Sequence, residues 1–332
     1  MISGKGIYIW QLFDDLIPDP ETLAEQLVET GFAHVVIKVS NAAYVYNHSG
    51  GDLVPSYLAA FRAVGIAVWG FQYVYGNDPI GEARQGIQRT LNLGLDGLVI
   101  DAEGEYKHKG AAAARYMSDL RAGLPGVPLA LSSYRWPSVH PEFPWREFLA
   151  KVDLVMPQVY WVDANNPAEQ LRKSIAEYAS LAPAKPYIPT GAAYHERGFT
   201  ATDGQMTEFF QAVKAERLLG CNFWELSNSL RYNLFNTLAR LSWSGQTENP
   251  EPPEPEPEPE PTSRITLANP YSDRMNFRSD PAVSTETLQG QLYDGTTAEI
   301  LERKTVGQDE WLRVSVEGWI AKRVSGREYV QE

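Results

Sequence analysis

Length, charge and hydropathy limit what this chain can be. Its 332 residues suffice for one large domain and a second, smaller one. The net charge of −13, with no basic stripe, argues against nucleic acid as a partner. A mean hydropathy of −0.33 and the lack of any apolar run of about 18 residues argue against a membrane span.

The cysteine count and the first residues narrow the class further. The single Cys221 excludes an internal disulfide and a cysteine-based zinc cluster, and we interpret it as a small buried apolar residue. The first ten residues, MISGKGIYIW, lack a basic segment followed by an apolar core. The sequence therefore shows no secretory signal.

Strand-like and helix-like segments alternate over residues 1–245. The strand-like runs are GIYIWQL (6–12), HVVIKVS (34–40), AVWGFQYVY (67–75), GLVIDAEG (97–104), PLALSSYR (128–135), LVMPQVYW (154–161), YIPTGAAY (187–194) and NFWELSN (222–228). The segments between them suit helices, as in PETLAEQLVETG with its helical apolar spacing and terminal glycine. Eight such alternations predict a (β/α)8 TIM barrel. The alternative, a doubly wound open sheet, would require a glycine-rich phosphate turn after the first strand, and GIYIWQLFDD has none.

Residues 246–263 are predicted to be a Pro/Glu-rich linker. The stretch ENPEPPEPEPEPEPT (248–262) alternates Pro and Glu, so it can neither bury a core nor form a helix. Twelve such residues in polyproline II geometry would span about 37 Å. The segment is expected to act as a stiff spacer between two domains.

Residues 264–332 carry short β-like runs. TAEILER, EWLRVSV and EGWIAKRV are separated by turn signals such as DGT and EG. This pattern predicts a small all-β barrel after the linker.

Two carboxylates end the fourth strand-like run, in the stretch DGLVIDAEG (96–104). Side chains alternate along a strand, so Asp101 and Glu103 are expected to point the same way and Ile100 the other way. In a (β/α)8 barrel the chemistry lies at the C-terminal ends of the strands. The other strand ends supply aromatic, amide, imidazole and carboxylate side chains: Trp10, Gln72, Tyr73, Tyr75, Tyr134, Trp136, Gln158, Tyr160, Trp161, Tyr194, His195, Trp224 and Glu225.

A carboxylate pair within a rim of aromatic and amide groups is typical of sites that act on sugars. Glycosidic cleavage needs a carboxylic acid to protonate the leaving oxygen and a second group to stabilise the oxocarbenium-like transition state. A glutamate beside an aspartate can have a raised pKa, which keeps it protonated for that role. The structural alternative is that the aromatic residues only fill the barrel mouth and that Asp101 and Glu103 pair with Lys38 or an arginine.

Other chemistries find less support. The five histidines show no HExxH or other ligand spacing, so no metal site and no cofactor are predicted. There is no GxSxG motif, and Ser132–Ser133 lacks an evident base. His195 and His108 would lie at the barrel top and are candidates for substrate binding, although a lone surface histidine needs no function.

Residues 1–244 resemble the lysozyme-type muramidases of glycoside hydrolase family 25. The similar stretches are GIYIW, HVVIKVSNAAYVYN, YLAAFRAVGIAVWGFQY, GLVIDAE, SSYRWP, PQVYW and FWELSN, in the family's order. The resemblance implies a catalytic role for Asp101 and Glu103, with Glu103 as general acid acting on peptidoglycan. DGLVIDAE also looks like the chitinase motif of family 18, with Val99 in place of its first aspartate.

Two carboxylates that the muramidase family expects are missing. Tyr8 stands at the first position and Trp161, after Tyr160, at the second. Glu225 is a candidate replacement for one of them. The alternative function is a catalytically inactive barrel that binds a glycan without cutting it.

Residues 264–332 resemble bacterial SH3-type domains, through MNFRSDP, LYDGTTAEIL, DEWLRV and EGWIAKR in that order. The residues that carry the resemblance are Asn276, Arg278, Gly295, Trp311, Gly318 and Trp319. Many such domains tether hydrolases to cell-wall peptide. Together the two resemblances imply an enzyme of the endolysin or exported type that acts at the bacterial cell wall.

Overall fold

The computed structural model describes residues 2–243 and, further on, 264–268, 274–278, 281, 288–293, 296–306, 309–314, 318–324, 327–328 and 330–331. The chain divides into two compact units, Met1–Thr247 and Glu248–Glu332. The predicted linker 246–263 lies outside the described residues. No described helix has the length and apolar character needed to cross a membrane.

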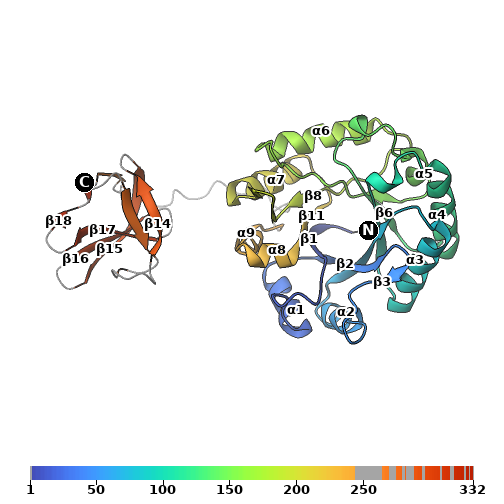
Figure 1. Ribbon diagram of the computed structural model, residues 1–332, viewed down its shortest axis with the longest axis horizontal. Coiled ribbons are helices and arrows are strands. Elements are labelled where there is room, and N and C mark those ends of the chain that lie inside the picture. Colours follow the sequence, from blue (N-terminus) through green and yellow to red (C-terminus); the bar gives the residue numbers. More distant parts are fainter. Residues whose placement is uncertain are drawn as a thin grey trace, which may run out of the picture. The chain divides into compact units, whose positions relative to one another are not determined.

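The first unit is a ring of parallel strands surrounded by helices (Figure 1), which confirms the predicted barrel. Its strands are β1 (Gly4–Ile9), β2 (His34–Asn41), β4 (Ala67–Val74), β5 (Gly97–Ala102), β6 (Leu129–Ser132), β7 (Leu154–Val155), β8 (Thr190–Ala192) and β11 (Gly220–Trp224). Their order around the sheet is β7-β6-β5-β4-β2-β1-β11-β8. The helices are α1 (Pro20–Glu29), α2 (Val54–Ala63), α3 (Pro79–Leu93), α4 (Gly110–Gly123), α5 (Trp145–Leu149), α6 (Pro167–Ala179), α7 (Asp203–Ala215), α8 (Leu226–Arg231) and α9 (Phe235–Arg240).

Strands β7 and β8 are shorter than the sequence runs predict. Isolated parallel bridges between Val155 and Tyr187 and between Gln158 and Thr190 join the two strands and close the ring. Pro157 and Pro189 lie in these segments, and proline cannot donate to a strand ladder. The closing seam therefore carries fewer regular strand pairs than the rest of the barrel. Small elements that the sequence did not predict lie in loops: β3 (Tyr44–Val45), β9 (His195–Glu196) and β10 (Phe199–Thr200).

The strand pleat divides the apolar core into two layers. Val99 faces the barrel interior together with Val36, Phe71 and other strand residues. Ile100 packs in the larger cluster between the strands and the surrounding helices. Strand residues of one parity thus fill the barrel, and those of the other parity hold the helices.

A buried lysine ties β1 to two helix ends. The Lys5 ammonium donates hydrogen bonds to the carbonyl oxygens of Thr30 at 2.6 Å, Leu238 at 2.6 Å and Leu241 at 2.7 Å. It also lies 4.4 Å from the centre of the Phe32 ring. Burial lowers its pKa to about 8. Thr30 follows α1, Leu238 lies in the last turn of α9 and Leu241 follows that helix, so one side chain fixes both helix ends to the base of the barrel.

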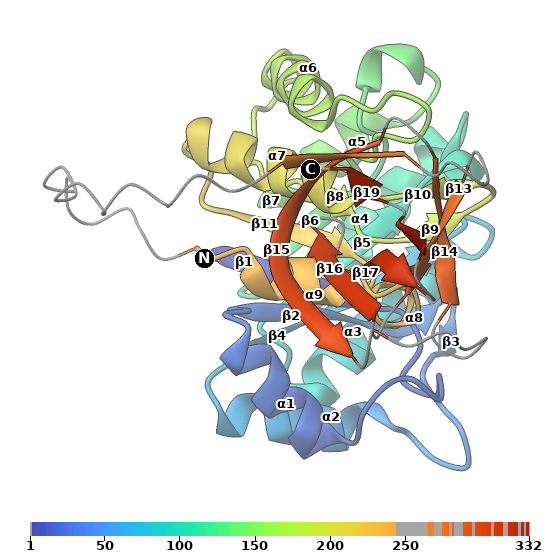
Figure 2. The same ribbon diagram turned by 90° about the vertical axis from the view of Figure 1, so that its left-hand side faces the viewer.

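The second unit is an antiparallel sheet of short strands, whose curved strands β15–β17 are visible in Figure 2. Its strands are β12 (Arg264–Leu267), β13 (Arg274–Arg278), β14 (Leu288–Tyr293), β15 (Thr297–Val306), β16 (Asp309–Val314), β17 (Gly318–Val324), β18 (Arg327–Glu328) and β19 (Val330–Gln331). Leu267, Met275, Ala298 and Leu312 form its small buried core.

Replacing Lys5 tests the anchoring of the helix ends. Lys5→Met keeps the approximate length of the side chain but leaves three carbonyl groups without their donor. The free energy of unfolding should therefore fall by about 3 kcal/mol. Denaturant titration at neutral pH, followed by circular dichroism, measures the change. Lys151→Met, at an exposed position, is the control and should stay within about 0.5 kcal/mol of the parent. Equal stability of the two variants would contradict the anchoring role.

Candidate active site

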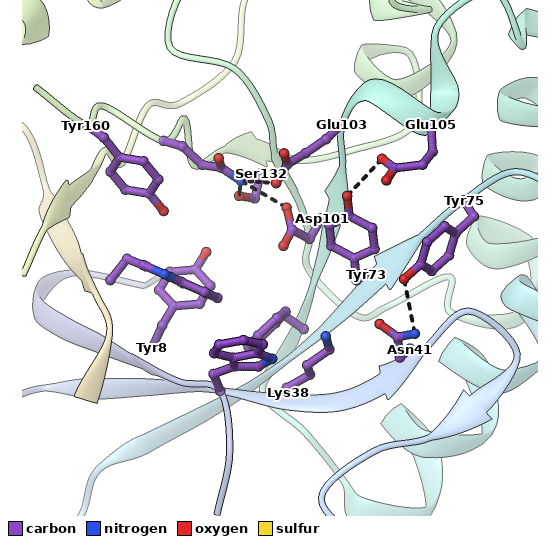
Figure 3. A pocket seen from close by; sticks show the side chains of 14 residues that line it. Tyr8, Lys38, Asn41, Tyr73, Tyr75, Asp101, Glu103, Glu105, Ser132 and Tyr160 are labelled. Carbon is purple, nitrogen blue, oxygen red and sulfur yellow. Dashed lines mark hydrogen bonds between the residues drawn. The ribbon is translucent and has the colours of Figure 1, made fainter. Parts of the chain in front are cut away.

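A cavity of about 300 Å³ opens at the C-terminal ends of the barrel strands, and we call it the mouth cavity. Its side chains come from strands β1, β2, β4, β5, β6 and β11 and from the loops that follow β1, β4, β5 and β7 (Figure 3). Its lining residues are Tyr8, Trp10, Lys38, Asn41, Phe71, Tyr73, Tyr75, Asp101, Glu103, Glu105, Ser132, Gln158, Tyr160 and Trp224. The site therefore lies where a barrel of this type places its chemistry.

Asp101 and Glu103, the carboxyl pair, share one amide donor. The Gln158 Nε2 atom donates to Asp101 Oδ1 at 3.1 Å and to Glu103 Oε1 at 2.9 Å. Asp101 is 5% exposed at the penultimate position of β5, and Glu103 is half-buried just beyond it. Both point into the mouth cavity, as the alternation of side chains along a strand predicts.

The carboxyl pair holds protons more tightly than free carboxylates do. Burial, followed by the nearby charge of Glu103, raises the pKa of Asp101 well above its usual range, although Lys38 and Gln158 act in the opposite direction. Burial also raises the pKa of Glu103, against the effect of the hydrogen bond from Gln158. Two carboxyl groups in one low-dielectric site resist simultaneous ionisation. A proton is therefore available in the cavity at pH values where an isolated carboxylate has lost it.

Lys38 projects from β2 into the same cavity between aromatic rings. Its ammonium lies 4.3 Å from the ring centre of Tyr46, 5.6 Å from that of Tyr73 and 5.9 Å from that of Trp10. Burial lowers its pKa to about 8. Within the part of the chain that the structure describes, neither Asp101 nor Glu103 forms an ion pair with Lys38 or with an arginine. The alternative interpretation, in which such pairs neutralise the two carboxylates, is wrong.

Aromatic rings form one wall of the mouth cavity. Trp224 is the central ring, with its centre 5.4 Å from that of Tyr8, 5.8 Å from Phe71 and 6.3 Å from Trp10. Trp10 is 39% exposed, so part of its ring remains open to a ligand. Apolar ring faces of this kind suit the C–H faces of sugars.

Tyr73 brings a third carboxylate to the cavity. Its hydroxyl donates to Glu105 Oε2 at 2.8 Å, and its ring contacts Tyr75 with centres 5.0 Å apart. Sequence reasoning missed Glu105, which follows the DAE motif by two residues in a 3₁₀ turn, Gly104–Tyr106. It also missed Asn41, and it weighed Lys38 only as an ion-pair partner and Ser132 only as a nucleophile without a base. Position at a strand end was the one signal for these residues.

Gln72 does not belong to the site. The neighbouring Tyr73 faces the mouth cavity, so Gln72 faces the helices and is fully buried. Its Nε2 atom donates to the carbonyl oxygens of Ala42 and Glu82, both at 2.8 Å, and its Oε1 atom accepts from the Tyr116 hydroxyl at 3.0 Å. Gln72 joins β4 to the surrounding helices, and the predicted role in substrate binding is wrong.

Trp161 is also directed away from the cavity. Its fully buried ring packs 5.4 Å from Phe209, centre to centre, and its Nε1–H donates to Gln205 Oε1 at 3.2 Å. Its neighbour Tyr160 lines the cavity. A side chain at position 161 points toward α7, so the predicted contact of Trp161 with substrate is wrong.

Glu225 follows Trp224 and is 2% exposed. Its two carboxylate oxygens accept from the backbone N–H of Ser227 at 3.1 Å and of Asn228 at 2.7 Å, which caps α8. It does not line the mouth cavity. Its use as a replacement for a missing catalytic carboxylate is therefore excluded by its orientation.

A second cavity of about 430 Å³ adjoins the first, and we call it the side cavity. Glu103, Gln158 and Tyr160 line both cavities. Tyr134 lines the side cavity, where its ring stacks on that of His140 with centres 3.5 Å apart. Glu103 thus lies at the boundary between two spaces, each of the size of a small ligand.

His195 lines neither cavity. Its Nδ1 atom is 2.6 Å from Thr200 Oγ1, and its ring lies 4.5 Å from that of Tyr232. The β9–β10 hairpin holds the ring beside α8 and outside both cavities, so its role in substrate binding stays a prediction. Over the described residues, no group of three or more histidine, cysteine, aspartate or glutamate side chains is arranged to hold a metal ion.

Comparison with known proteins supports the fold. The sequence matches no protein family model and no curated protein. The spore cortex-lytic enzyme SleL of Bacillus cereus is similar in structure, with a TM-score of 0.52 and 9% identity over 70% of this chain and 74% of that one. A chitinase from Chromobacterium violaceum gives a TM-score of 0.54 and 11% identity over 72% of this chain and 100% of that one. The PgaB glycoside hydrolase domain of Bordetella bronchiseptica gives a TM-score of 0.55 and 12% identity over 74% of this chain and 100% of that one. At these identities the similarity establishes a shared TIM-barrel fold.

Proposed function

We propose that the first unit is a glycoside hydrolase that acts on bacterial cell-wall peptidoglycan or a related N-acetylhexosamine glycan. The observation that carries this proposal is the carboxyl pair, which is buried at the barrel mouth, shares the Gln158 amide and has raised pKa values. The aromatic wall supports a sugar ligand. The similar solved structures, which include a spore cortex-lytic enzyme and a chitinase, support the same substrate class.

Glu103 acts as the general acid in this proposal. It lies at the boundary of the two cavities, so a glycan that occupies both would place a glycosidic oxygen beside it. Asp101 lies deeper in the mouth cavity and either orients an acetamido group or stabilises the developing cation. Gln158 and Tyr160 hold the sugar, and Tyr73 and Trp224 bound the same space.

We propose that the first unit is related to the muramidases of family 25 or to the chitinases of family 18. The motif Asp101-Ala102-Glu103 supports both the resemblance to the muramidases and the resemblance to the chitinases. Where those families have carboxylates, this chain has Tyr8 on the cavity floor, Val99 in the barrel core and Trp161 against α7. These replacements favour a second candidate, a barrel that binds a glycan without cutting it.

The second unit is proposed to be an SH3-type module that binds cell-wall peptide. Among the residues that carry that resemblance, Asn276 is exposed, whereas Arg278 and Trp311 are buried. Gly318 begins β17. Gly295 and the Trp319 side chain lie outside what the structure describes. Together with the proposed linker 246–263, the module would place the hydrolase at the cell wall.

Removing the acid tests the catalytic role. Glu103→Gln preserves size but supplies no proton, so the rate of release of reducing ends from peptidoglycan should fall by about 10²–10⁴-fold while glycan binding persists. Asp101→Asn should also be severe. Glu105→Gln is the matched control, because this carboxylate lines the same cavity but accepts a hydrogen bond from Tyr73. The rate of this variant should fall less than that of Glu103→Gln. A parent protein that binds peptidoglycan or chitin fragments and releases no reducing ends would favour the binding barrel.

The pH profile tests the electrostatics of the carboxyl pair. Activity requires a proton on the pair, so kcat/KM should decline as pH rises through the raised pKa of the pair. Lys38, charged below its pKa of about 8, lowers the pKa of Asp101. Lys38→Met should therefore move the alkaline limb of the profile to higher pH, and Lys151→Met should leave it in place. A limb that stays fixed or moves to lower pH in Lys38→Met would contradict this account.

Truncation tests the second unit. A chain that ends at residue 245 should sediment less with purified peptidoglycan than the full chain, because linked modules gain from effective concentration. Its rate on intact cell walls should fall far more than its rate on soluble fragments. Equal activity of the two proteins on whole walls would favour a structural role for the module.

A further inference from the structure

The side cavity differs from the mouth cavity in the sign of its charge. Three carboxylates, Asp101, Glu103 and Glu105, line the mouth cavity beside one lysine. Beyond the shared Glu103, the side cavity is lined by the cation of Arg135 and carries no further carboxylate. A glycan that crosses Glu103 therefore passes from an acidic space into a basic one.

Arg135 is a half-buried cation directed into this space. Its guanidinium lies 4.2 Å from the ring centre of Trp136, and one of its N–H groups donates to the carbonyl oxygen of Tyr160. Among the described residues no carboxylate lies within ion-pairing distance of it. Burial lowers its pKa, and only the Tyr194 hydroxyl acts in the opposite direction. A guanidinium has five N–H donors, so groups remain for a ligand after the bond to Tyr160.

A second cation reaches the same indole. The Lys173 ammonium, from α6, lies 3.6 Å from the Trp136 ring centre. The carboxylates nearby have other partners. Glu142 pairs with Lys107 at 2.5 Å, and Glu177 accepts from the Ser138 backbone at 2.8 Å. Among the described residues neither cation has an ion-pair partner, so Arg135 and Lys173 form a positive pair on one aromatic ring.

This charge has an energetic consequence. A partly desolvated cation without a counter-charge opposes stability, and a carboxylate placed against it recovers a strong, charge-assisted hydrogen bond. Chitin is uncharged and would leave the Arg135 cation without a counter-charge. A muramic-type sugar differs from its partner sugar by a lactyl group that ends in a carboxylate or in an amide-linked peptide.

We propose that the side cavity is a subsite for a carboxylate-bearing N-acetylhexosamine, with Arg135 receiving the lactyl carboxylate and Trp136 positioning the two cations. The inference rests on the proposed glycoside hydrolase function and narrows it to acidic glycans of the peptidoglycan type. Arg135 then sets specificity, while the carboxyl pair performs the cleavage.

The test compares one glycan in two charge states. Peptidoglycan strands from which an amidase has removed the peptides carry free lactyl carboxylates, and carbodiimide coupling to methylamine neutralises them. The parent full-length protein should cleave the free form with the higher kcat/KM. Arg135→Gln should lower kcat/KM on the free form by about 10- to 100-fold, the range expected for a lost charged hydrogen bond, and change the amidated form by less than about twofold.

Controls separate charge from structure. Arg135→Lys keeps the charge and should recover part of the loss, and Lys173→Met, at an exposed position, should give a smaller loss of the same selectivity. Arg146→Gln, a surface arginine beside Glu147, should leave both substrates unchanged. Equal cleavage of the two forms by the parent, or equal slowing of both in Arg135→Gln, would overturn the proposal while leaving the hydrolase function intact.

Binding distinguishes the remaining outcomes. If neither form is cleaved, calorimetry on the parent protein still tests the subsite. Tighter binding of the free carboxylate form, lost in Arg135→Gln, would support the subsite and refute the hydrolase. Hyaluronan fragments carry their carboxylates on glucuronic acid and not on an N-acetylhexosamine. A preference for them over the muramic strands would therefore overturn the assignment to the lactyl group.

Discussion

The two-residue alternation of side chains along closed, parallel barrel strands is the constraint on which the site depends. In β5 it directs Val99 into the barrel core, Asp101 into the mouth and Ile100 toward the helices. The same parity brings Tyr8 and Trp224 to the cavity wall. Because the ring is closed, residues from distant parts of the chain that share this parity must meet above its core.

The same constraint separates what the sequence could predict from what it could not. Alternating apolar runs were sufficient for the eight strands, and the DAE spacing was sufficient to direct both carboxylates inward. Three other predicted residues, Gln72, Trp161 and Glu225, are each the immediate neighbour of a residue that does line the cavity. Position at a strand end identified the end of the barrel at which the site lies. Whether a given side chain points into the cavity or toward the helices depends on where its strand begins and bends, and the sequence does not show this.

Contacts between strands that are distant in sequence were beyond prediction for a different reason. The shared hydrogen bonds of Gln158 depend on the stagger between β5 and the segment after β7, which only the closed ring fixes. The side cavity is formed by loops, whose course depends on tertiary packing. Arg135 therefore looked like an ordinary basic residue in SSYRWP, and its proximity to Glu103 and Trp136 became evident only in three dimensions.

Gln158 has two structural roles, one through its backbone and one through its side chain. Its backbone bridges Tyr134 on one side and Thr190 on the other, at the seam where regular strand pairing is sparse. Its side chain holds Asp101 and Glu103. A shift of the backbone at this seam would therefore move the Gln158 amide relative to both acids, which lie together at the end of β5. The pairing that closes the ring and the hydrogen bonds that hold the two acids thus depend on the same residue, and a ligand that displaced this seam would weaken the hold on the acids without touching either of them.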